Sequence, residues 1–215
     1  PEYFSDIHRT YEDGERLVTT PPYTAYLKIA EGCSNGCAFC IIPKLRGKYR
    51  SRSVEALLAE AEKLAASGVK ELIVIAQDIT RYGLDLPESA SLARLVRELC
   101  RLDFQWIRLH YLYPEAITDE LIDVIASEPK VLHYLDIPIQ HCNDGILKAM
   151  RRRNTRAELE ELFDKLRGAM PDVVIRTSLI CGLPGEGEAE FEELCEFLRE
   201  QKLQRVGEFQ FSPEE

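Results

Sequence analysis

The chain has 215 residues, a length that suits one large domain or two small ones. Hydrophobic residues make up 45% and charged residues 30%, which excludes a chain that is disordered throughout. The 27 Lys and Arg residues stand against 37 Asp and Glu, and the net charge of −10 argues against a surface that broadly coats nucleic acid. We find neither an apolar run near the roughly 18 residues of a membrane span nor a signal-peptide pattern. We therefore expect a cytoplasmic protein without membrane contact.

Short apolar runs alternate with amphipathic stretches along most of the chain. Residues 1–22 are polar and irregular and predict a linker or an extended arm. Six buried strands are expected at 25–30, 71–76, 106–112, 134–139, 174–181 and 206–211. Five helices are expected at about 53–66, 92–101, 118–127, 155–169 and 188–201.

The helix boundaries have recognisable signals. Ser53 precedes an apolar stripe at helical spacing, and Gly68 follows it as a stop signal. Thr155 and Glu158 have the spacing of a capping box. Alternating strands and helices imply parallel strands joined by right-handed crossovers, in an open sheet or in a complete or partial barrel. In each of these architectures the chemistry lies at the C-terminal ends of the strands.

Three of the seven cysteines fall within eight residues, directly after the first expected strand, at Cys33, Cys37 and Cys40. An odd number of cysteines in an acidic chain without a signal peptide does not suit a secreted disulfide framework. Clustered thiols in a reducing compartment indicate metal or cofactor ligands. The remaining four are scattered, and Cys100, Cys142, Cys181 and Cys195 are expected to be packing residues or unrelated to this cluster.

The number of thiols in this loop distinguishes between kinds of metal site. A structural zinc needs a fourth protein ligand, and the histidines His8, His110, His133 and His141 are isolated from one another. Three cysteines suit a cubane iron–sulfur cluster in which one iron has no protein ligand. A structural zinc site or a non-enzymatic metal-binding module is the alternative.

The motif Cys33-x-x-x-Cys37-x-Phe39-Cys40 resembles the signature of radical S-adenosylmethionine (SAM) enzymes. The resemblance implies an α/β fold, a partial (β/α)6 TIM-like barrel, with Cys33, Cys37 and Cys40 binding a 4Fe-4S cluster. It further implies that the open iron binds SAM, and that electron transfer cleaves SAM to methionine and a 5′-deoxyadenosyl radical.

Further segments resemble the methylthiotransferases within this superfamily, and they cover nearly all of residues 23–215. They are the run from Glu31 to Arg52, Ala76 to Gly83, Asp136 to His141, and Arg176 to Glu186. Tyr134 to Pro138, Gln77-Asp78 and the ending from Phe209 to Glu215 resemble the RimO-like branch, and Ile137 to Cys142 differs from the pattern typical of the tRNA-modifying branch. That branch methylthiolates the β-carbon of an aspartate in a small-subunit ribosomal protein. The tRNA adenosine methylthiotransferases are the alternative branch.

The resemblance implies further cofactor-binding residues. They are Phe39, Gln77, Asp78, Gln140, Arg152, Arg176 and Gly182. Gln77 and Gln140 each end a strand and are favoured as SAM contacts over loop-capping amides, whereas Asp78 also suits a turn cap. Arg176 needs a carboxylate partner, which either SAM or a protein acid supplies. The backbone N–H groups around Gly182 are candidates to face a ligand.

Relatives of this kind carry an N-terminal domain with a second 4Fe-4S cluster and a small C-terminal β domain. We expect 23–215 to be the radical SAM core alone, a segment of a longer protein, that binds the first cluster and SAM without completing sulfur insertion. The implied partners are a small-subunit ribosomal protein or the ribosomal subunit, and an electron donor such as a flavodoxin or ferredoxin. The chain is expected to be a monomer.

A basic run, Lys44, Arg46, Lys48, Arg50 and Arg52, contrasts with the overall negative charge. Beside a cluster-binding loop it favours an RNA-containing partner. A solvated loop held by neighbouring acids is the equal alternative.

Overall fold

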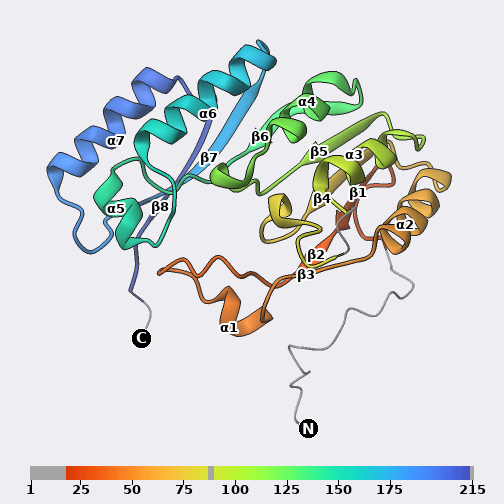
Figure 1. The fold of residues 1–215 in the computed structure, drawn as a ribbon, viewed down its shortest axis with the longest axis horizontal. Coiled ribbons are helices and arrows are strands. Elements are labelled where there is room, and N and C mark those ends of the chain that lie inside the picture. The colour runs from red at the N-terminus through yellow and green to blue at the C-terminus, as the bar shows by residue number, and fades with distance from the viewer. Residues whose placement is uncertain (1–17, 87–89, 214–215) are drawn as a thin grey trace, which may run out of the picture.

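The computed structural model describes residues 18–86 and 90–213, and its centre is a six-stranded parallel sheet. The strands follow the order β1-β4-β5-β6-β7-β8 (Figure 1). Their bounds are Thr24–Lys28, Glu71–Ile75, Trp106–Leu109, Val131–Asp136, Val174–Cys181 and Arg205–Gln210. Among the described residues β1 and β8 each pair with one neighbour and not with each other, so the sheet is an arc rather than a closed barrel. The expected partial barrel with six strands is confirmed.

Five long helices connect the strands, with bounds Val54–Ala66 (α2), Leu92–Cys100 (α3), Asp119–Ser127 (α4), Arg156–Ala169 (α6) and Glu188–Gln201 (α7). The first four begin at a Ser or Thr whose hydroxyl accepts a backbone N–H of the first turn. At α6 the Thr155–Glu158 capping box is complete, because Glu158 also accepts the N–H of Thr155 at 2.7 Å. These caps satisfy N–H groups that have no partner inside the helix. All five expected helices are confirmed.

Two expected strands differ from the observed ones. The fourth begins earlier and ends at Asp136, and beyond it Pro138 has no N–H to donate, although Gln140 still forms an isolated parallel bridge with Leu179. The third ends at Leu109 instead of residue 112, since Tyr111 has a φ of +66° and leaves the extended conformation. The polypeptide therefore bends at the strand ends, where the site is expected.

The sequence patterns did not predict several short elements. They are β2 (Ala30–Glu31) and β3 (Arg50–Ser51), which pair antiparallel, the helices α1 (Ile42–Arg46) and α5 (Asp144–Ala149), and the 3₁₀ turns η1 (Ile79–Arg81) and η2 (Pro114–Ala116). The β2–β3 pair closes the base of the segment that holds the three cysteines and α1. This segment lies below the sheet, apart from the long helices (Figure 1).

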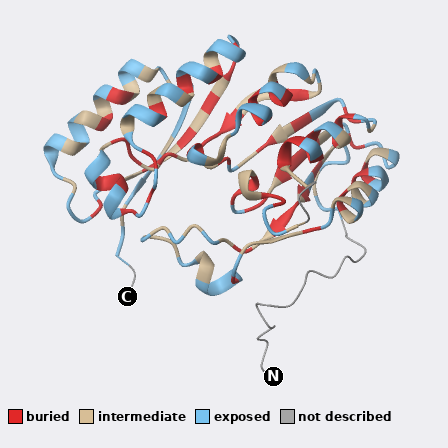
Figure 2. Cartoon of the chain, viewed as in Figure 1, coloured by how far each residue is buried: buried red, intermediate tan, exposed pale blue. Residues whose placement is uncertain are grey.

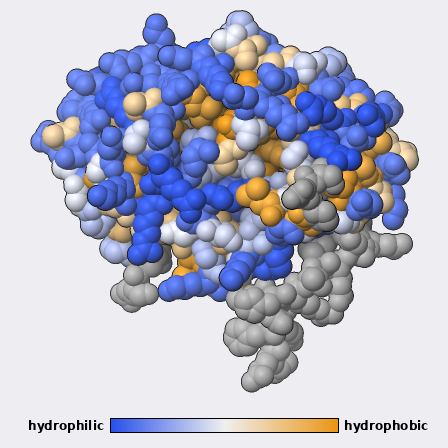
Figure 3. Space-filling view, in the orientation of Figure 1, coloured by the Kyte–Doolittle hydropathy of each residue, from blue (hydrophilic) through white to orange (hydrophobic). Residues whose placement is uncertain are grey.

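The hydrophobic core lies between the sheet and the helices that cover it (Figure 2). Buried side chains alternate along β7, and Leu27 of β1, Leu72 of β4 and Phe163 of α6 have no exposed surface. Hydrophilic side chains cover most of the face in Figure 3. Within the described residues, no helix has the length and apolar character of a membrane span. Cys100, Cys142 and Cys181 are buried, as expected of small packing residues, and Cys195 is partly buried.

Candidate active site

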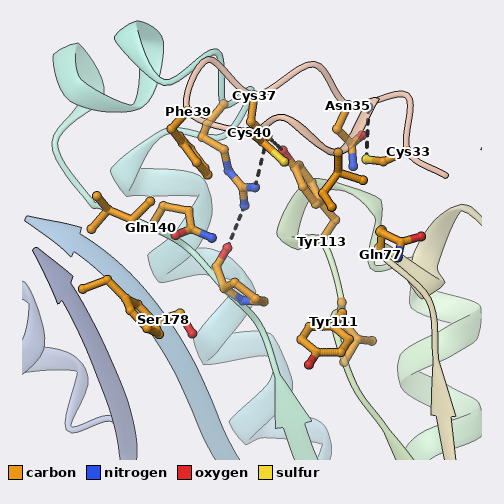
Figure 4. A pocket seen from close by; sticks show the side chains of 16 residues that line it. Cys33, Asn35, Cys37, Phe39, Cys40, Gln77, Tyr111, Tyr113, Gln140 and Ser178 are labelled. Atoms are coloured by element: carbon orange, nitrogen blue, oxygen red, sulfur yellow. Dashed lines mark hydrogen bonds between the residues drawn. The ribbon is translucent and has the colours of Figure 1, made fainter. Parts of the chain in front are cut away.

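A cavity of about 380 Å³ lies over the C-terminal ends of the strands (Figure 4). It lies beneath the loop that carries Cys33, Cys37 and Cys40, which we call the cysteine loop. Residues from five strand ends and from the loop line it together. They include Cys33, Cys37, Cys40, Phe39, Gln77, Tyr111, Tyr113, Gln140, Arg152, Ser178 and Phe209. The cavity therefore joins the three cysteines of the motif with four of the other site residues expected from the sequence.

The cysteine loop makes a tight wrap that depends on glycine. Gly32 has a φ of +76°, and a Cβ atom at this position would lie 2.2 Å from the carbonyl oxygen of Lys48. The N–H of Cys33 then donates to the carbonyl of Gly47 at 3.1 Å, which joins the two ends of the segment. Gly36 has a φ of +71°, and a Cβ atom there would meet no other atom within 4 Å, so only its backbone conformation favours glycine.

Two contacts fix the loop to the barrel. On one side the Asn35 Nδ2 donates to Asp78 Oδ2 at 2.8 Å, and Asp78 is fully buried. On the other side the N–H of Ala38 donates to the carbonyl of Met150 at 3.0 Å, and Phe39 packs against a small cluster that includes Met150. The thiols on the loop are thereby held over the strand ends.

Cys37 lies beside a cationic and an aromatic side chain. The Tyr113 hydroxyl is 2.9 Å from Cys37 Sγ, and Arg152 Nη1 is 4.0 Å from the same sulfur. The guanidinium of Arg152 stacks on the Tyr113 ring at 3.8 Å and donates to the carbonyl of Pro138 at 2.8 Å. The Cys37 sulfur thus lies between a phenol hydroxyl and a guanidinium group at the edge of the cavity.

Burial disfavours the thiolate form of Cys33. Removal from water raises the pKa of the Cys33 thiol, and the negative charge of Asp78 adds to the effect. The N–H of Asn35 donates to Cys33 Sγ at 3.5 Å and partly offsets it. Without a bound cation, Cys33 is therefore held in its protonated form.

Two amide side chains point into the cavity from the ends of β4 and β6, the strands on either side of β5. Gln77 follows β4, and Gln140 follows β6, where its backbone has a φ of +72°. Neither amide has a hydrogen-bond partner within the described part of the chain, whereas the Gln140 N–H donates to the carbonyl of Ser178 at 2.9 Å. The backbone is thus fixed while both amides are available to a ligand.

The residues around the cavity fit an iron–sulfur cluster with SAM. All three thiols are free and face one cavity, and within residues 18–86 and 90–213 no group of three His, Cys, Asp or Glu side chains is arranged for a single metal ion. A cluster binds each thiol through a different iron, so it suits thiols that are spread along a cavity wall. Asn35 Oδ1 and Arg152 Nε are buried beside the cavity without a partner, and a polar ligand satisfies such groups.

Three expected cofactor-binding residues lie outside the cavity lining. Asp78 binds Asn35 and accepts the N–H of Thr80 at 3.0 Å, so it supports the loop from behind. Arg176 forms an ion pair with Asp136, and a protein acid is therefore the carboxylate partner found here. The N–H of Gly182 donates to Glu186 Oε2 at 2.7 Å and does not face the cavity. Their assignment to SAM stays a prediction.

A buried histidine links two strand-end loops beside Gln140. His141 is fully buried, and its Nδ1 accepts the N–H of Asn143 at 2.9 Å. Its Nε2 lies 3.6 Å from Glu186 Oε1, and the other oxygen of Glu186 accepts the N–H of Gly182. Burial lowers the pKa of His141 despite the nearby carboxylate of Glu186. The loop after β6 and the loop after β7 are thereby joined by one side-chain pair.

Sequence reasoning missed Asn35, Tyr113, Ser178 and Phe209, which also line the cavity. Asn35 lies between two motif cysteines, and that position was the only signal for it. Ser178 lies on the same face of β7 as Ile180, because side chains alternate between the two faces of a strand. The alternation predicts Ser178 as a lining residue once it is known which face of β7 borders the cavity. Tyr113 and Phe209 carry no local signal, since tertiary structure alone brings them to Cys37 and the cavity.

The comparison with protein families decides the family of this chain. The family model for the radical SAM superfamily matches residues 27–198. The chain belongs to the radical SAM superfamily. The matched range holds β4, β5, β6 and β7 in full, and it includes the cysteine loop.

Comparison with curated relatives shows which branch of the radical SAM superfamily the chain resembles. The chain is 54% identical to a "Ribosomal protein uS12 methylthiotransferase RimO" of Caldanaerobacter subterraneus subsp. tengcongensis, over 93% of this chain and 46% of that protein. It is 53% identical to the protein of the same name from Geobacter sulfurreducens, over 99% of this chain and 48% of that protein. The resemblance to the RimO-like branch is confirmed, and the chain spans about half the length of these relatives.

Solved structures of radical SAM enzymes share the fold. The TsrM methyltransferase from Kitasatospora setae, described with cobalamin and a [4Fe-4S] cluster bound, matches with a TM-score of 0.71. It is 18% identical, over 87% of this chain and 36% of that one. The OxsB enzyme, described with aqua-cobalamin and S-adenosylmethionine bound, matches with a TM-score of 0.63 at 16% identity, over 85% of this chain and 27% of that one. At these identities the likeness concerns the fold alone.

Proposed function

We propose that this chain is the catalytic core of a methylthiotransferase that adds a methylthio group to the β-carbon of an aspartate in a small-subunit ribosomal protein. The observation that carries the proposal is the cavity that joins Cys33, Cys37 and Cys40 to free amides at two strand ends. The identity of 50% or more to proteins named as uS12 methylthiotransferases supports the substrate class. Residues 23–215 form the core domain in this proposal, and residues 1–22 are a linker, most of which lies outside the described residues.

Cys33, Cys37 and Cys40 would hold a 4Fe-4S cluster, and SAM would occupy the cavity beside it. Together these groups supply reductive cleavage of SAM, which generates a radical able to attack an unactivated C–H bond. Gln77 and Gln140 would present amide donors and acceptors to SAM, and the apolar side chains of Phe39 and Ile180 would cover part of it. Arg152, 4.0 Å from Cys37, would place a positive charge beside the bound cluster.

Other assignments follow from the proposed function. A second cluster would be held by a further domain of the full protein, and an electron donor such as a flavodoxin or ferredoxin would reduce the first cluster. The reaction would take place in the cytoplasm, where ribosomal subunits are assembled, with the protein as a monomer.

Cluster reconstitution tests the base of this proposal. The chain is reconstituted anaerobically with iron and sulfide, reduced with dithionite, and measured by electron paramagnetic resonance with and without SAM. We expect a reduced-cluster signal that changes when SAM is added and is lost in Cys37→Ala. A signal indifferent to SAM, or bound zinc with four ligands, would assign the thiols to a structural metal site.

A substrate comparison tests the branch. The full-length protein, loaded with its clusters, is supplied with small ribosomal subunits in one reaction and with tRNA in another. Mass spectrometry of the ribosomal proteins and of the tRNA nucleosides then reports where the methylthio group appears. Modification of an aspartate supports the proposal, and modification of an adenosine would replace it with the tRNA branch.

A further inference from the structure

The segment that carries the three cysteines has a charge opposite to that of the remaining chain. Residues 32–54 contain five cationic side chains and neither Asp nor Glu. The other 22 Lys and Arg residues stand against 37 acids, so the remainder of the chain has a net charge of −15. We use the name "basic loop" for residues 44–50, which contain Lys44, Arg46, Lys48 and Arg50.

Neighbouring acids neutralise only part of this charge. Arg52 is buried and paired with Glu60 at 2.7 Å, so it belongs to the fold and not to the surface. Arg46 is 3.6 Å from Glu31, a carboxylate that also binds Lys28. Within the described residues Lys44 and Lys48 form no ion pair, and both are exposed. The alternative of a loop held by acids therefore applies to Arg52 and in part to Arg46.

The backbone of the basic loop is held in place without the help of its lysines. Arg50 Nη1 donates to the carbonyl of Lys48 at 2.8 Å and to that of Arg46 at 3.3 Å. Arg50 thereby satisfies carbonyl groups at the end of α1. The carbonyl of Gly47 accepts the N–H of Cys33. Lys44 and Lys48 thus place their charges on a fixed backbone, and within the described residues their side chains form neither a hydrogen bond nor an ion pair.

The position of the basic loop connects it to the cavity. Cys40 and Ile42 both line the cavity, and α1 begins at Ile42. In Figure 1, α1 projects from the lower edge, away from the sheet and the long helices. A partner bound to the basic loop therefore lies at the mouth of the cavity, where the proposed substrate must enter.

We propose that the basic loop binds the phosphate backbone of RNA in the substrate assembly and so places the target protein at the cavity. The inference rests on the proposed function for its choice of partner, because a protein of the small ribosomal subunit is surrounded by RNA. Lysines are point charges that suit phosphates without base recognition, and the described part of the basic loop presents no exposed aromatic side chain for stacking. The binding is therefore independent of RNA sequence and sensitive to salt.

Salt-dependent RNA binding tests the proposal. Binding of a short labelled RNA hairpin to the cluster-loaded chain is followed by fluorescence anisotropy between about 50 and about 200 mM KCl. The double variant Lys44→Ala/Lys48→Ala is expected to bind roughly tenfold more weakly at low salt. The plot of the logarithm of its binding constant against the logarithm of the KCl concentration is expected to be less steep by about 2, since each lost phosphate contact reduces the steepness by about 1.

Two control variants separate local charge from other effects. Lys63→Ala/Lys202→Ala removes the same charge from exposed positions on α2 and after α7, and it is expected to retain the affinity of the wild type. Lys44→Arg/Lys48→Arg keeps the charge and is expected to bind RNA normally. Equal weakening of both alanine double variants, or no RNA binding by the wild type at low salt, would overturn the proposal.

A competition experiment separates RNA from an acidic protein as the partner. Polyglutamate that displaces the hairpin as well as unlabelled RNA does, at equal charge concentration, would overturn the choice of RNA. The cluster signal and its response to SAM are measured on the same samples. If RNA binding depends on the two lysines but the cluster does not respond to SAM, the proposed function alone is contradicted. If the cluster responds to SAM but RNA binding does not depend on the lysines, the RNA-binding role of the basic loop alone is contradicted.

Discussion

Single side chains set the electrostatics at the mouth of the barrel. Arg152 brings a cation to Cys37, whereas burial keeps Cys33 protonated, so the two thiols of one motif have different environments. A bound cation at the loop removes the second effect, because it stabilises the thiolate at each cysteine. We therefore expect metal binding at the loop to release protons, and the affinity to increase with pH.

His141 makes the stability of the fold depend on pH. Burial lowers the pKa of His141 in the folded protein below the ordinary value of 6.5, so below that pH the unfolded chain binds a proton more readily than the folded one. We expect the free energy of unfolding to fall as the pH is lowered from 7.5 to below about 6. Urea denaturation at several pH values measures this, and His141→Asn, which keeps an acceptor for the Asn143 N–H, is expected to flatten the profile. An unchanged profile in the variant would assign the dependence to other groups, such as His110, whose pKa burial also lowers.

Short elements and loops position the residues of the site, whereas the long helices and strands form the fold. The long helices and the strands were predictable because each holds several turns or alternations of buried residues. The β2–β3 pair has two residues in each strand and α1 has five, too few for a period to emerge. The cysteines, Gln77 and Gln140 were predictable from motifs, and Asn35 had only its position between two motif cysteines as a signal, whereas Tyr113 required knowledge of which strand ends meet. Interactions between distant residues position the site, and a local pattern does not contain them.

The two glycines of the cysteine loop form a matched pair. Both have a positive φ, but only at Gly32 would a side chain collide with backbone, at 2.2 Å from the carbonyl of Lys48. Gly36→Ala is expected to cost about 1 kcal/mol of stability, from backbone strain alone. Gly32→Ala is expected to cost more and to speed amide hydrogen exchange throughout the loop. The measurements are urea denaturation and hydrogen exchange, and equal costs for the two variants would contradict the close packing at Gly32.

The whole molecule has an uneven distribution of burial across its sheet. Central strands β4 and β5 each have a partner on both sides and buried residues, whereas β8 has β7 as its one partner among the described strands and is exposed along most of its length. Local stability follows burial and backbone pairing, so β8 is expected to open more easily than the centre of the sheet. Hydrogen exchange with mass spectrometry is expected to show faster exchange in peptides covering 205–210 than in those covering 71–75. Equal protection of the two strands would show that the sheet unfolds as one unit.

The left-handed backbone at Gln140 has a consequence for how residues at the cavity are selected. A residue other than glycine costs about 1 to 2 kcal/mol in this conformation, and the Gln140 side chain makes no hydrogen bond in the described structure that would offset the cost. Gln140→Gly is therefore expected to raise the free energy of unfolding, by about 0.5 to 1 kcal/mol once the freer unfolded chain is considered, while weakening SAM binding. Lys202→Gly relieves the same kind of strain far from the cavity, at a φ of +46°, and is expected to leave SAM binding unchanged. In the proposed function, stability favours glycine at position 140 and SAM binding favours glutamine, so a more stable fold at this position is expected to bind SAM more weakly.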